Sequence, residues 1–332
     1  MKYRRLGRSG LKISSLVLGT MNFGNPTGKE ESFKIIDRAI EAGINLFDCA
    51  DVYAQGESER ILGEAFARNG KRKDIFITSK VFMRTGPGPN DAGNSKHHII
   101  ESCEASLKRL RTDHIDIYFL HRADFDMPQE ESLGALDLLV RQGKVRYIGS
   151  STHPAWKVVE ALWIADQYHY PKFICEQPPY NLLDRRIENE IVPLCKAYDL
   201  GLMTWSPLAQ GVLGGRYTDP FNLPEGSRGT QKRIYAERIT QKGVEVSLKL
   251  TERAKGKGCT VAQLAVAWIL NQPGITGAII GPRTFEQFED LLPSADMKLD
   301  DYDFQFCDQL VPIGAYVSNH FNTSLWLKGS QL

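Results

Sequence analysis

Residues 115–149 read IDIYFLHRADFDMPQEESLGALDLLVRQGKVRYIG, and they contain the unit from which the fold is predicted. The stretch opens with a short apolar run, Ile115–Leu120, and continues through a polar loop to an amphipathic helix over Glu130–Gln142. A second apolar run, Val145–Gly149, follows. Neither run alternates cleanly between apolar and polar residues, which is typical of strands buried on both faces. The stretch therefore predicts a strand–helix–strand unit with parallel strands.

Six further apolar runs extend this pattern along the chain, with amphipathic helical segments between them. They are Ser15–Leu18, Asn45–Phe47, Ile75–Thr78, Phe173–Cys175, Gly201–Thr204 and Gly277–Ile280. The helical segments after the first and last runs start with the spacing of a capping box, at Thr27–Glu30 and Thr284–Gln287. Eight strand–helix units can close a barrel, so the sequence predicts an α/β fold, a single (β/α)8 TIM barrel over residues 1–332.

Two of the predicted connecting loops are long. Met83–Asn94 is rich in glycine and proline, and Ala209–Thr240 is basic and interrupted by Pro220 and Pro224. Loops of this length in a compact domain usually have a function. Because no Ser/Gly linker or low-complexity block divides the chain, we expect one domain with long connecting loops and a C-terminal tail.

Composition excludes several classes of protein. The 41 Lys and Arg residues nearly balance the 40 Asp and Glu residues, which argues against a nucleic-acid-binding surface. The apolar runs are shorter than the roughly 18 residues that cross a membrane, and residues 1–10 lack a signal-peptide pattern. The six cysteines have no paired spacing, which indicates reduced thiols. We therefore expect a cytoplasmic enzyme that acts on a small molecule; the sequence does not fix its oligomeric state.

The familiar nucleotide and metal motifs are incomplete. Gly24–Lys29 is one residue shorter than a P-loop, and Glu30 stands where Ser or Thr should bind magnesium. Gly86–Asp91 lacks the third glycine of a dinucleotide fingerprint. His97 and His98 are adjacent and point to different faces of a helix, and no H-x-x-x-H or C-x-x-C spacing occurs. No metal site is predicted.

The strongest functional signal is the position of four polar side chains. Asp48 ends the second apolar run, Lys80 the third and His121 the fourth, while Tyr53 follows Asp48 by five residues. In a barrel the carboxyl ends of the strands meet at the active-site mouth. Each residue alone has a structural explanation, as a turn Asp, a solvated Lys, a structural His or a rim Tyr. Four of them from three consecutive units, at one end of the barrel, favour a functional site.

These side chains together can protonate an oxygen that gains negative charge. A tyrosine hydroxyl has a pKa of about 10 and is a poor proton source at neutral pH. We expect the Lys80 ammonium to lower the pKa of Tyr53 towards the working range, and Asp48 to keep Lys80 charged and oriented. His121 would hydrogen-bond the substrate carbonyl or assist the proton transfer. Carbonyl reduction requires these functions.

The residues around this group resemble the aldo-keto reductase family. Residues 43–53, GINLFDCADVY, and 57–63, ESERILG, match the family's most specific signature, and the similarity extends from Leu16 to the GPRT segment at 281–284. The resemblance implies a (β/α)8 barrel, a nicotinamide cofactor bound without a Rossmann fold, and a branch with long loops that includes potassium-channel β-subunits. The implied catalytic tetrad is Asp48, Tyr53, Lys80 and His121.

The last strand leads into a candidate phosphate site. Gly277–Ile280 runs into Gly281–Thr284 and a helix start, and barrels commonly bind phosphate in the loops after strands seven and eight. Free amides at a helix start favour an anion, and Arg283 can donate two hydrogen bonds to a phosphate. An ordinary cap beside an exposed arginine explains the same residues equally well. The family resemblance favours the cofactor, and Arg283 would favour NADPH over NADH.

The resemblance also distributes other residues around the dinucleotide. Ser151, Thr152 and Gln177 would contact the nicotinamide carboxamide, and Trp205 would stack on the ring. The other implied contacts are Thr20, Met21 and Asp48 near the nicotinamide, Ser206, Pro207, Leu208, Ala209, Gln210, Arg216 and Arg228 around the pyrophosphate, and Gly281, Arg283, Gln287 and Asp290 towards the adenosine end. Thr152 replaces the usual asparagine, and Asp290-Leu291 stands where Glu-Asn is common.

Substrate contacts are expected from variable loops and the C-terminal tail. The expected contacts are Tyr53, Phe82, His121 and Arg122, with Met21, Phe23, Val52, Met83, Phe321 and Trp326 as further candidates. An apolar, aromatic rim suits aldehydes and ketones, including open-chain sugars, but identifies no single substrate.

Three hypotheses follow for the function. The first is an NADPH-dependent carbonyl reductase with Tyr53 as proton donor. The second is a cofactor-binding regulatory subunit or redox sensor resembling potassium-channel β-subunits; His121 argues against it, because those relatives carry another residue at that position. The third is a metal-dependent barrel hydrolase that uses His121 and His153, and it lacks the expected carboxylate–histidine cluster.

Overall fold

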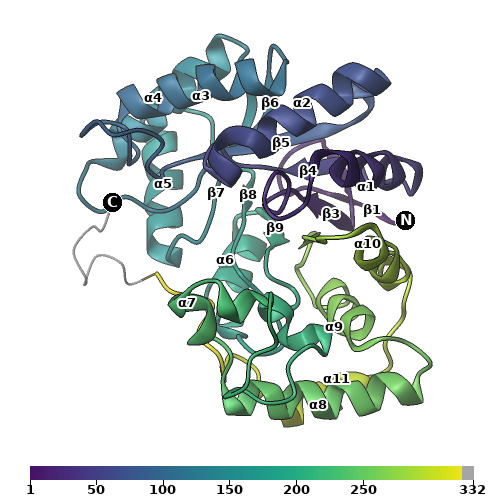
Figure 1. Ribbon diagram of the computed structural model, residues 1–332. Helices are drawn as coiled ribbons and strands as arrows, with labels where there is room; N and C mark the ends of the chain where they lie inside the picture. The colour runs from purple at the N-terminus through teal and green to yellow at the C-terminus, as the bar shows by residue number, and fades with distance from the viewer. Residues whose placement is uncertain (324–332) are drawn as a thin grey trace.

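The computed structural model describes residues 1–323, and its centre is a closed barrel of eight parallel strands (Figure 1). Around the barrel the order is β10, β3, β4, β5, β6, β7, β8 and β9, so consecutive strands pair and the last strand pairs with the first. The strands are β3 (Leu16–Gly19), β4 (Leu46–Asp48), β5 (Phe76–Val81), β6 (Ile115–Leu120), β7 (Val145–Ser150), β8 (Cys175–Glu176), β9 (Gly201–Thr204) and β10 (Gly277–Ile280). The predicted (β/α)8 barrel is confirmed.

Helices surround the barrel, and most of them bury one face, whereas the short α7 has no buried residue. They are α1 (Lys29–Glu41), α2 (Glu57–Asn69), α3 (Lys96–Leu110), α4 (Gln129–Arg141), α5 (Ala155–Tyr168), α6 (Ile191–Ala197), α7 (Arg233–Ala236), α8 (Gln241–Gly256), α9 (Val261–Leu270), α10 (Phe285–Leu291) and α11 (Asp301–Leu310). In α9 all the apolar residues are buried, because the helix packs against both α8 and α10 as well as the barrel. A capping box between Thr260 and Gln263 starts this helix.

A short antiparallel hairpin, β1 (Tyr3–Arg5) with β2 (Lys12–Ser14), precedes the barrel and was not predicted from the sequence. Leu6 and Ile13 of this hairpin are fully buried in the same apolar cluster as Val17 and Leu46 from the barrel strands. The hairpin therefore closes the amino-terminal end of the barrel, and the carboxyl ends of the strands remain as the open mouth.

Two predicted local features differ in the structure. Thr27 is not a helix cap: its hydroxyl donates to the Arg283 carbonyl at 2.9 Å, and α1 starts after Gly28 without a side-chain cap. At the other site Thr284 does cap α10, but the Gln287 side chain accepts from the Arg283 amide instead of returning to Thr284. The Thr27 hydroxyl therefore joins the loop after β3 to the loop after β10.

The segment 209–240, predicted as a loop, contains three short helical elements: η4 (Ala209–Gly214), η5 (Arg228–Thr230) and α7. The following α8 and the late α11, which the sequence interpretation omitted, lie side by side (Figure 1). Arg253 of α8 and Lys257, the residue after that helix, both donate to the buried carboxylate of Asp303 on α11. This ion-pair cluster holds α11 against α8 in the outer layer of helices.

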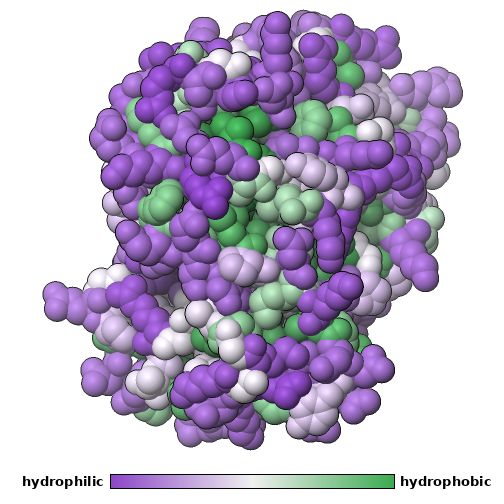
Figure 2. Space-filling view, turned by 90° about the vertical axis from the view of Figure 1, so that its right-hand side faces the viewer, coloured by the Kyte–Doolittle hydropathy of each residue, from purple (hydrophilic) through white to green (hydrophobic). Residues whose placement is uncertain are grey.

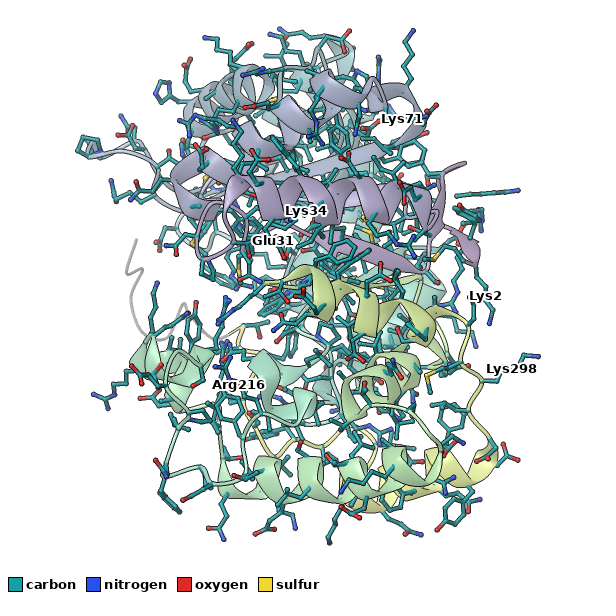
Figure 3. The ribbon with its side chains drawn as sticks, turned by 45° about the vertical axis from the view of Figure 1, so that its right-hand side comes forward. Lys2, Glu31, Lys34, Lys71, Arg216 and Lys298 are labelled. Atoms are coloured by element: carbon teal, nitrogen blue, oxygen red, sulfur yellow. The ribbon has the colours of Figure 1, made fainter. Side chains whose placement is uncertain are left out.

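One face of the molecule is mostly polar at its surface. On the face in Figure 2, hydrophilic residues dominate and hydrophobic residues show in separate patches. Figure 3 shows Glu31 and Lys34 on α1, where Glu31 also accepts from the Phe285 amide and so ties α1 to α10. Within residues 1–323 no helix combines the length and apolar character needed to cross a membrane.

Candidate active site

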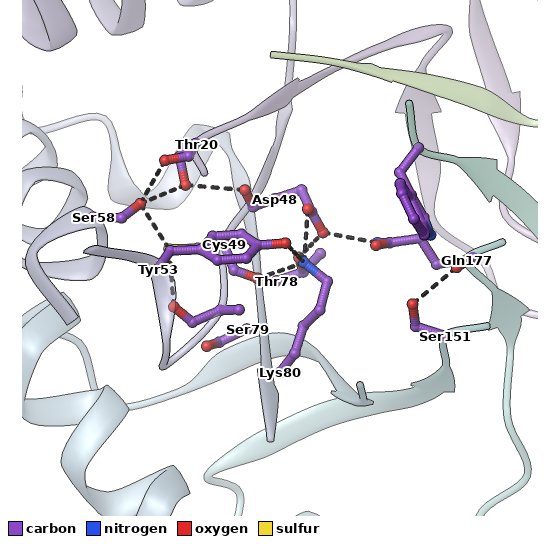
Figure 4. Close-up of polar contacts among 12 residues, drawn as sticks. Thr20, Asp48, Cys49, Tyr53, Ser58, Thr78, Ser79, Lys80, Ser151 and Gln177 are labelled. Carbon is purple, nitrogen blue, oxygen red and sulfur yellow. Dashed lines mark hydrogen bonds and ion pairs between the residues drawn. The ribbon is translucent and has the colours of Figure 1, made fainter. Parts of the chain in front are cut away.

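Asp48, Tyr53 and Lys80 meet at the open end of the barrel (Figure 4). Asp48 is the last residue of β4, Lys80 lies in β5, and Tyr53 begins the short helix η1 (Tyr53–Gly56) after β4. The Lys80 Nζ donates to Asp48 Oδ2 at 2.7 Å, to the Cys49 carbonyl at 2.7 Å and to the Tyr53 hydroxyl at 3.3 Å. An ammonium has three N–H groups, so these contacts use all of its donors.

The Asp48 carboxylate is held on its other side as well. Its Oδ1 accepts from the Thr78 hydroxyl at 2.7 Å and from Gln177 Nε2 at 2.8 Å. Thr78 was not predicted as a site residue. Its sequence signal is the two-residue spacing from Lys80, because residues i and i+2 of a strand point to the same face. The carboxylate that orients Lys80 is therefore itself fixed from β5 and, across the barrel, from the segment after β8.

The pKa of Tyr53 is raised above its ordinary value, contrary to the sequence expectation. Burial of the phenol is the largest effect, and it outweighs the lowering by the charge and hydrogen bond of Lys80. For Lys80 itself, burial lowers the pKa, but Asp48 and Tyr53 together raise it above the ordinary value. At neutral pH the pair is therefore a neutral phenol beside an ammonium.

His121 follows β6 and stands beside Tyr53, with ring centroids 6.0 Å apart in an edge-on arrangement. Burial, followed by the charges of Lys80 and Arg122, lowers its pKa well below the ordinary value. Its Nδ1 is buried and has no hydrogen-bond partner among the described residues. His121 is thus a neutral imidazole at pH 7.

The four side chains can deliver a proton to a substrate oxygen. Because the Tyr53 oxygen accepts from Lys80, its own O–H is free to donate to a group in the barrel mouth. The Lys80 ammonium stabilises the phenolate that remains after transfer. The neutral His121 imidazole lies beside the same point, where it can hydrogen-bond the polarised oxygen.

A network of buried hydrogen bonds holds Asp48 and its neighbours in place. Thr20 donates to the Asp48 carbonyl at 3.0 Å, and Ser58 of α2 donates to the Thr20 carbonyl at 2.8 Å. Cys49 is fully buried, lies 3.2 Å from the Ser58 hydroxyl, and burial raises the pKa of its thiol to about 12. The Cys49 side chain is therefore a packing group, while its carbonyl orients Lys80.

The residues predicted for the nicotinamide lie next to Asp48. The Ser151 hydroxyl donates to the Gln177 carbonyl at 2.9 Å, and the Gln177 side chain reaches Asp48 (Figure 4). The Trp205 indole donates to the Thr152 hydroxyl at 3.3 Å. Thr152, which replaces the usual asparagine, thus orients the Trp205 ring at the barrel mouth.

The segment after β9 curls above these residues. Ser206, Ala209 and Gln210 have positive φ angles, Pro207 and Ala209 are buried, and Leu208 packs on the main core. Gln210 Oε1 is buried without a partner in the part of the chain that the structure describes. The curled backbone is fixed, but this side-chain oxygen is available to a ligand.

Three arginines predicted for the dinucleotide phosphates form a cationic cluster. Arg283 donates to the Gly226 carbonyl at 3.3 Å, Arg216 to the Glu225 carbonyl at 3.1 Å, and Arg228 to the Asn22 side chain at 3.0 Å. Burial, then the charges of Arg228 and Arg216, lower the pKa of Arg283. Within residues 1–323 none of the three forms an ion pair with a carboxylate, and Arg216 projects from the long segment after β9 (Figure 3). Unneutralised arginines of this kind fit a phosphate-bearing cofactor.

Loops from three strands meet at this cluster. Asn22, after β3, donates to the Gly281 carbonyl at 2.8 Å and accepts from Arg228, while Met21 is 41% exposed beside it. The two side chains predicted to contact the adenosine, Gln287 and Asp290, already have hydrogen-bond partners within the protein. Gln287 accepts from the Arg283 amide, and Asp290 accepts from Gln263 and Thr260 at the start of α9.

The residues predicted to contact the substrate differ in their burial and position. Phe82 is nearly buried after β5, and Arg122 lies over the Trp205 ring, with its guanidinium 5.7 Å from the ring centroid. Val52 and Met83 are partly exposed. Phe23 is fully buried in the core, Phe321 packs against it, and Trp326 lies outside the described residues. Phe23 is therefore not a rim residue.

Comparison with known proteins places the whole barrel in one family. The sequence model of the Aldo/keto reductase family matches residues 15–312. An uncharacterized oxidoreductase, YrpG, of Bacillus subtilis is 37% identical over 94% of this chain and 96% of its own length. Probable voltage-gated potassium channel β-subunits of Arabidopsis thaliana and of rice, Oryza sativa, are each 38% identical, over 90% of this chain and 92% of theirs.

One conclusion follows from the barrel fold, the extent of the family match and the 37% sequence identity with an oxidoreductase. The chain belongs to the aldo/keto reductase family and is an NAD(P)H-dependent oxidoreductase.

Proposed function

We propose that the protein reduces aldehydes and ketones with NADPH, and that Tyr53 donates the proton. The observation that carries this proposal is the contact between the Tyr53 hydroxyl and a buried Lys80 ammonium whose other donors are occupied by Asp48 and the Cys49 carbonyl. This contact leaves the Tyr53 O–H as the proton donor nearest a carbonyl in the barrel mouth.

In the proposed reaction His121 and Tyr53 hydrogen-bond the carbonyl oxygen of the substrate. A reduced nicotinamide, held by Gln177 and Trp205 among others, would supply the hydride for the carbonyl carbon. Tyr53 transfers its proton to the oxygen as negative charge develops there, so the product is an alcohol. Lys80 stabilises the resulting phenolate until a proton from water restores the phenol. Asp48 keeps Lys80 aligned throughout.

The residues proposed to hold the cofactor are Ser151, Thr152, Gln177 and Trp205 at the nicotinamide, together with the curled segment Ser206–Gln210. Arg216, Arg228 and Arg283 would bind the phosphates. Their three unneutralised charges support NADPH over NADH, because NADPH carries an additional phosphate. Phe82 and Arg122 would line the substrate end of the site.

The second candidate function is that of a regulatory, cofactor-binding subunit. It is favoured by the two plant relatives named as probable potassium channel β-subunits. His121 supports the enzyme instead, because the resemblance implies another residue at this position in channel-associated relatives. We further propose a cytoplasmic protein whose whole chain, residues 1–332, forms one domain.

A Tyr53→Phe variant tests the proton-donor role. We expect NADPH to bind as in the wild type and to quench tryptophan fluorescence, while kcat for a generic aldehyde falls by about 10²–10⁴-fold. Tyr198→Phe, at an exposed tyrosine after α6, serves as the matched control and should retain full activity. Normal turnover by Tyr53→Phe would overturn the assignment.

A further inference from the structure

Arg122 carries a positive charge that nothing in the described structure neutralises. It directly follows His121 at the barrel mouth, and its Nη1 is buried without a hydrogen-bond partner among residues 1–323. Within residues 1–323 its guanidinium forms no ion pair with any carboxylate. Leaving a buried cationic donor unpaired is costly, so such groups usually have a ligand or a functional role.

The position of the Arg122 guanidinium is nevertheless well defined. It lies over the Trp205 ring, 5.7 Å from the centroid, which is within the range of a cation–π contact. Its backbone is anchored by Asn94, whose side chain donates to the Arg122 carbonyl at 2.8 Å. The side chain is therefore held in place while its donors remain free.

The nearby carboxylates have other partners. Glu176 is fully buried and accepts from the Ser150 hydroxyl and the His153 amide, and Asp48 binds Lys80. Asp124, two residues along the chain, accepts from the Asn94 and Asp126 amides. Each of these three carboxylates therefore already has hydrogen-bond or ion-pair partners other than Arg122.

A second arginine adds to the positive charge. Arg238, after α7, is partly buried and forms no ion pair within the described part of the chain. Burial, together with the charge of Arg238, lowers the pKa of Arg122 to about 10, so Arg122 remains protonated at neutral pH. The groups whose charges act on Arg122 are Tyr53, Arg238 and Glu176.

We propose that Arg122 binds an anionic group of the substrate, a carboxylate or a phosphate. The preferred substrates would then be carbonyl compounds that carry this negative charge a few bonds from the reacting carbon. The proposal rests on the proposed carbonyl reduction, because Tyr53 and His121 fix the carbonyl while Arg122 fixes the charged end. A planar guanidinium can donate two parallel hydrogen bonds to either anion.

The test uses pairs of substrates that differ in charge. The carboxylate pair is 4-carboxybenzaldehyde and its methyl ester, and the phosphate pair is D-glyceraldehyde 3-phosphate and D-glyceraldehyde. We expect the wild type to prefer the anionic member of at least one pair, and the pair that shows the preference identifies the kind of anion.

The variants separate a substrate contact from a structural role. Arg122→Gln should lower kcat/KM for the preferred anion by about 30-fold, mainly through KM, and lower it for the neutral partner by a much smaller factor. Arg122→Lys should restore part of the preference. The matched control is Arg233→Gln, at an exposed arginine on α7, which should leave both substrates unaffected.

A binding measurement decides the inference independently of turnover. Titration calorimetry of 4-(hydroxymethyl)benzoate and of inorganic phosphate into the NADP⁺ complex should show binding of one of them to the wild type and its loss in Arg122→Gln. Equal binding to both proteins, or equal kcat/KM within both substrate pairs, would contradict the proposal. Loss of NADPH affinity in Arg122→Gln, with an unchanged charge preference, would make Arg122 a cofactor contact instead. If NADPH reduces no carbonyl compound, the proposed function fails while the calorimetry still decides the anion site.

Discussion

At the scale of single residues, the distribution of the three Lys80 donors explains the chemistry. Asp48 and the Cys49 carbonyl take two of them, and the Tyr53 oxygen takes the third. The sequence predicted the contacts among Asp48, Tyr53 and Lys80, because all three occur at or after strand ends. It did not predict that the pKa of Tyr53 rises, since burial of the phenol depends on tertiary packing, including the His121 ring beside it.

The buried carboxyl group of Asp51 makes the stability of the protein depend on pH. Asp51 is 3% exposed, and neither of its carboxylate oxygens has a hydrogen-bond partner among the described residues. Burial, then the neighbouring charge of Glu59, raises its pKa to about 8. The folded protein therefore binds this proton more tightly than the unfolded chain does. The contribution is fully present below the unfolded pKa of about 4, and it is lost as the pH rises towards 8.

An Asp51→Asn variant should remove this dependence. We expect urea unfolding to give similar stability for variant and wild type at pH 5, but a variant more stable by a few kcal/mol at pH 9, at about 1.4 kcal/mol per pKa unit. Asp126→Asn, at an exposed aspartate, is the control. A stability difference that does not grow between pH 5 and pH 9 would show that Asp51 is not buried as a neutral acid.

At the scale of elements, apolar content decided which strands could be predicted. The barrel strands are buried on both faces, so runs such as Ile115–Leu120 were identified with their observed bounds. The hairpin β1–β2 was missed because its strands are short and charged, and Leu6 and Ile13 give too little pattern to indicate a barrel plug. The ladder at β8 is only two residues long, which explains why its predicted position was displaced from Cys175–Glu176.

The turn of this hairpin depends on Gly7. Its φ angle is +51°, and a Cβ there would lie 2.3 Å from the Ile174 carbonyl oxygen and 2.4 Å from the Gly201 nitrogen. Gly7→Ala should therefore push the plug away from the barrel and cost about 2–4 kcal/mol. Gly10→Ala, at a hairpin position with open space around the Cβ, is the control. Equal melting temperatures for the two variants would show that the hairpin is not packed this tightly.

At the scale of the whole molecule, the net charge of +1 conceals a local asymmetry. Arg216, Arg228 and Arg283 come together from the segment after β9 and the loop after β10, and none has a carboxylate partner in the described chain. The sequence indicated these arginines through the family resemblance. It could not show that Asp290 binds the start of α9, because that contact depends on the packing of α10 against α9.

Arg283→Gln should change the choice of cofactor. We expect the Kd for NADPH to rise by about tenfold or more and the Kd for NADH to change little, because a charge-assisted contact to the additional phosphate is lost. Arg38→Gln, at an arginine that instead pairs with Glu289, is the control. Equal losses for the two cofactors would place Arg283 at a phosphate that they share.

Hydride transfer itself tests the central claim most directly. The wild-type protein, loaded with NADPH deuterated at the transferable position of the nicotinamide, is mixed with 4-carboxybenzaldehyde in a single turnover. The proposed reductase should form the alcohol with one deuterium on the former carbonyl carbon. Tight NADPH binding without any deuterated alcohol, from this aldehyde or its methyl ester, would contradict the account and support a cofactor-binding subunit.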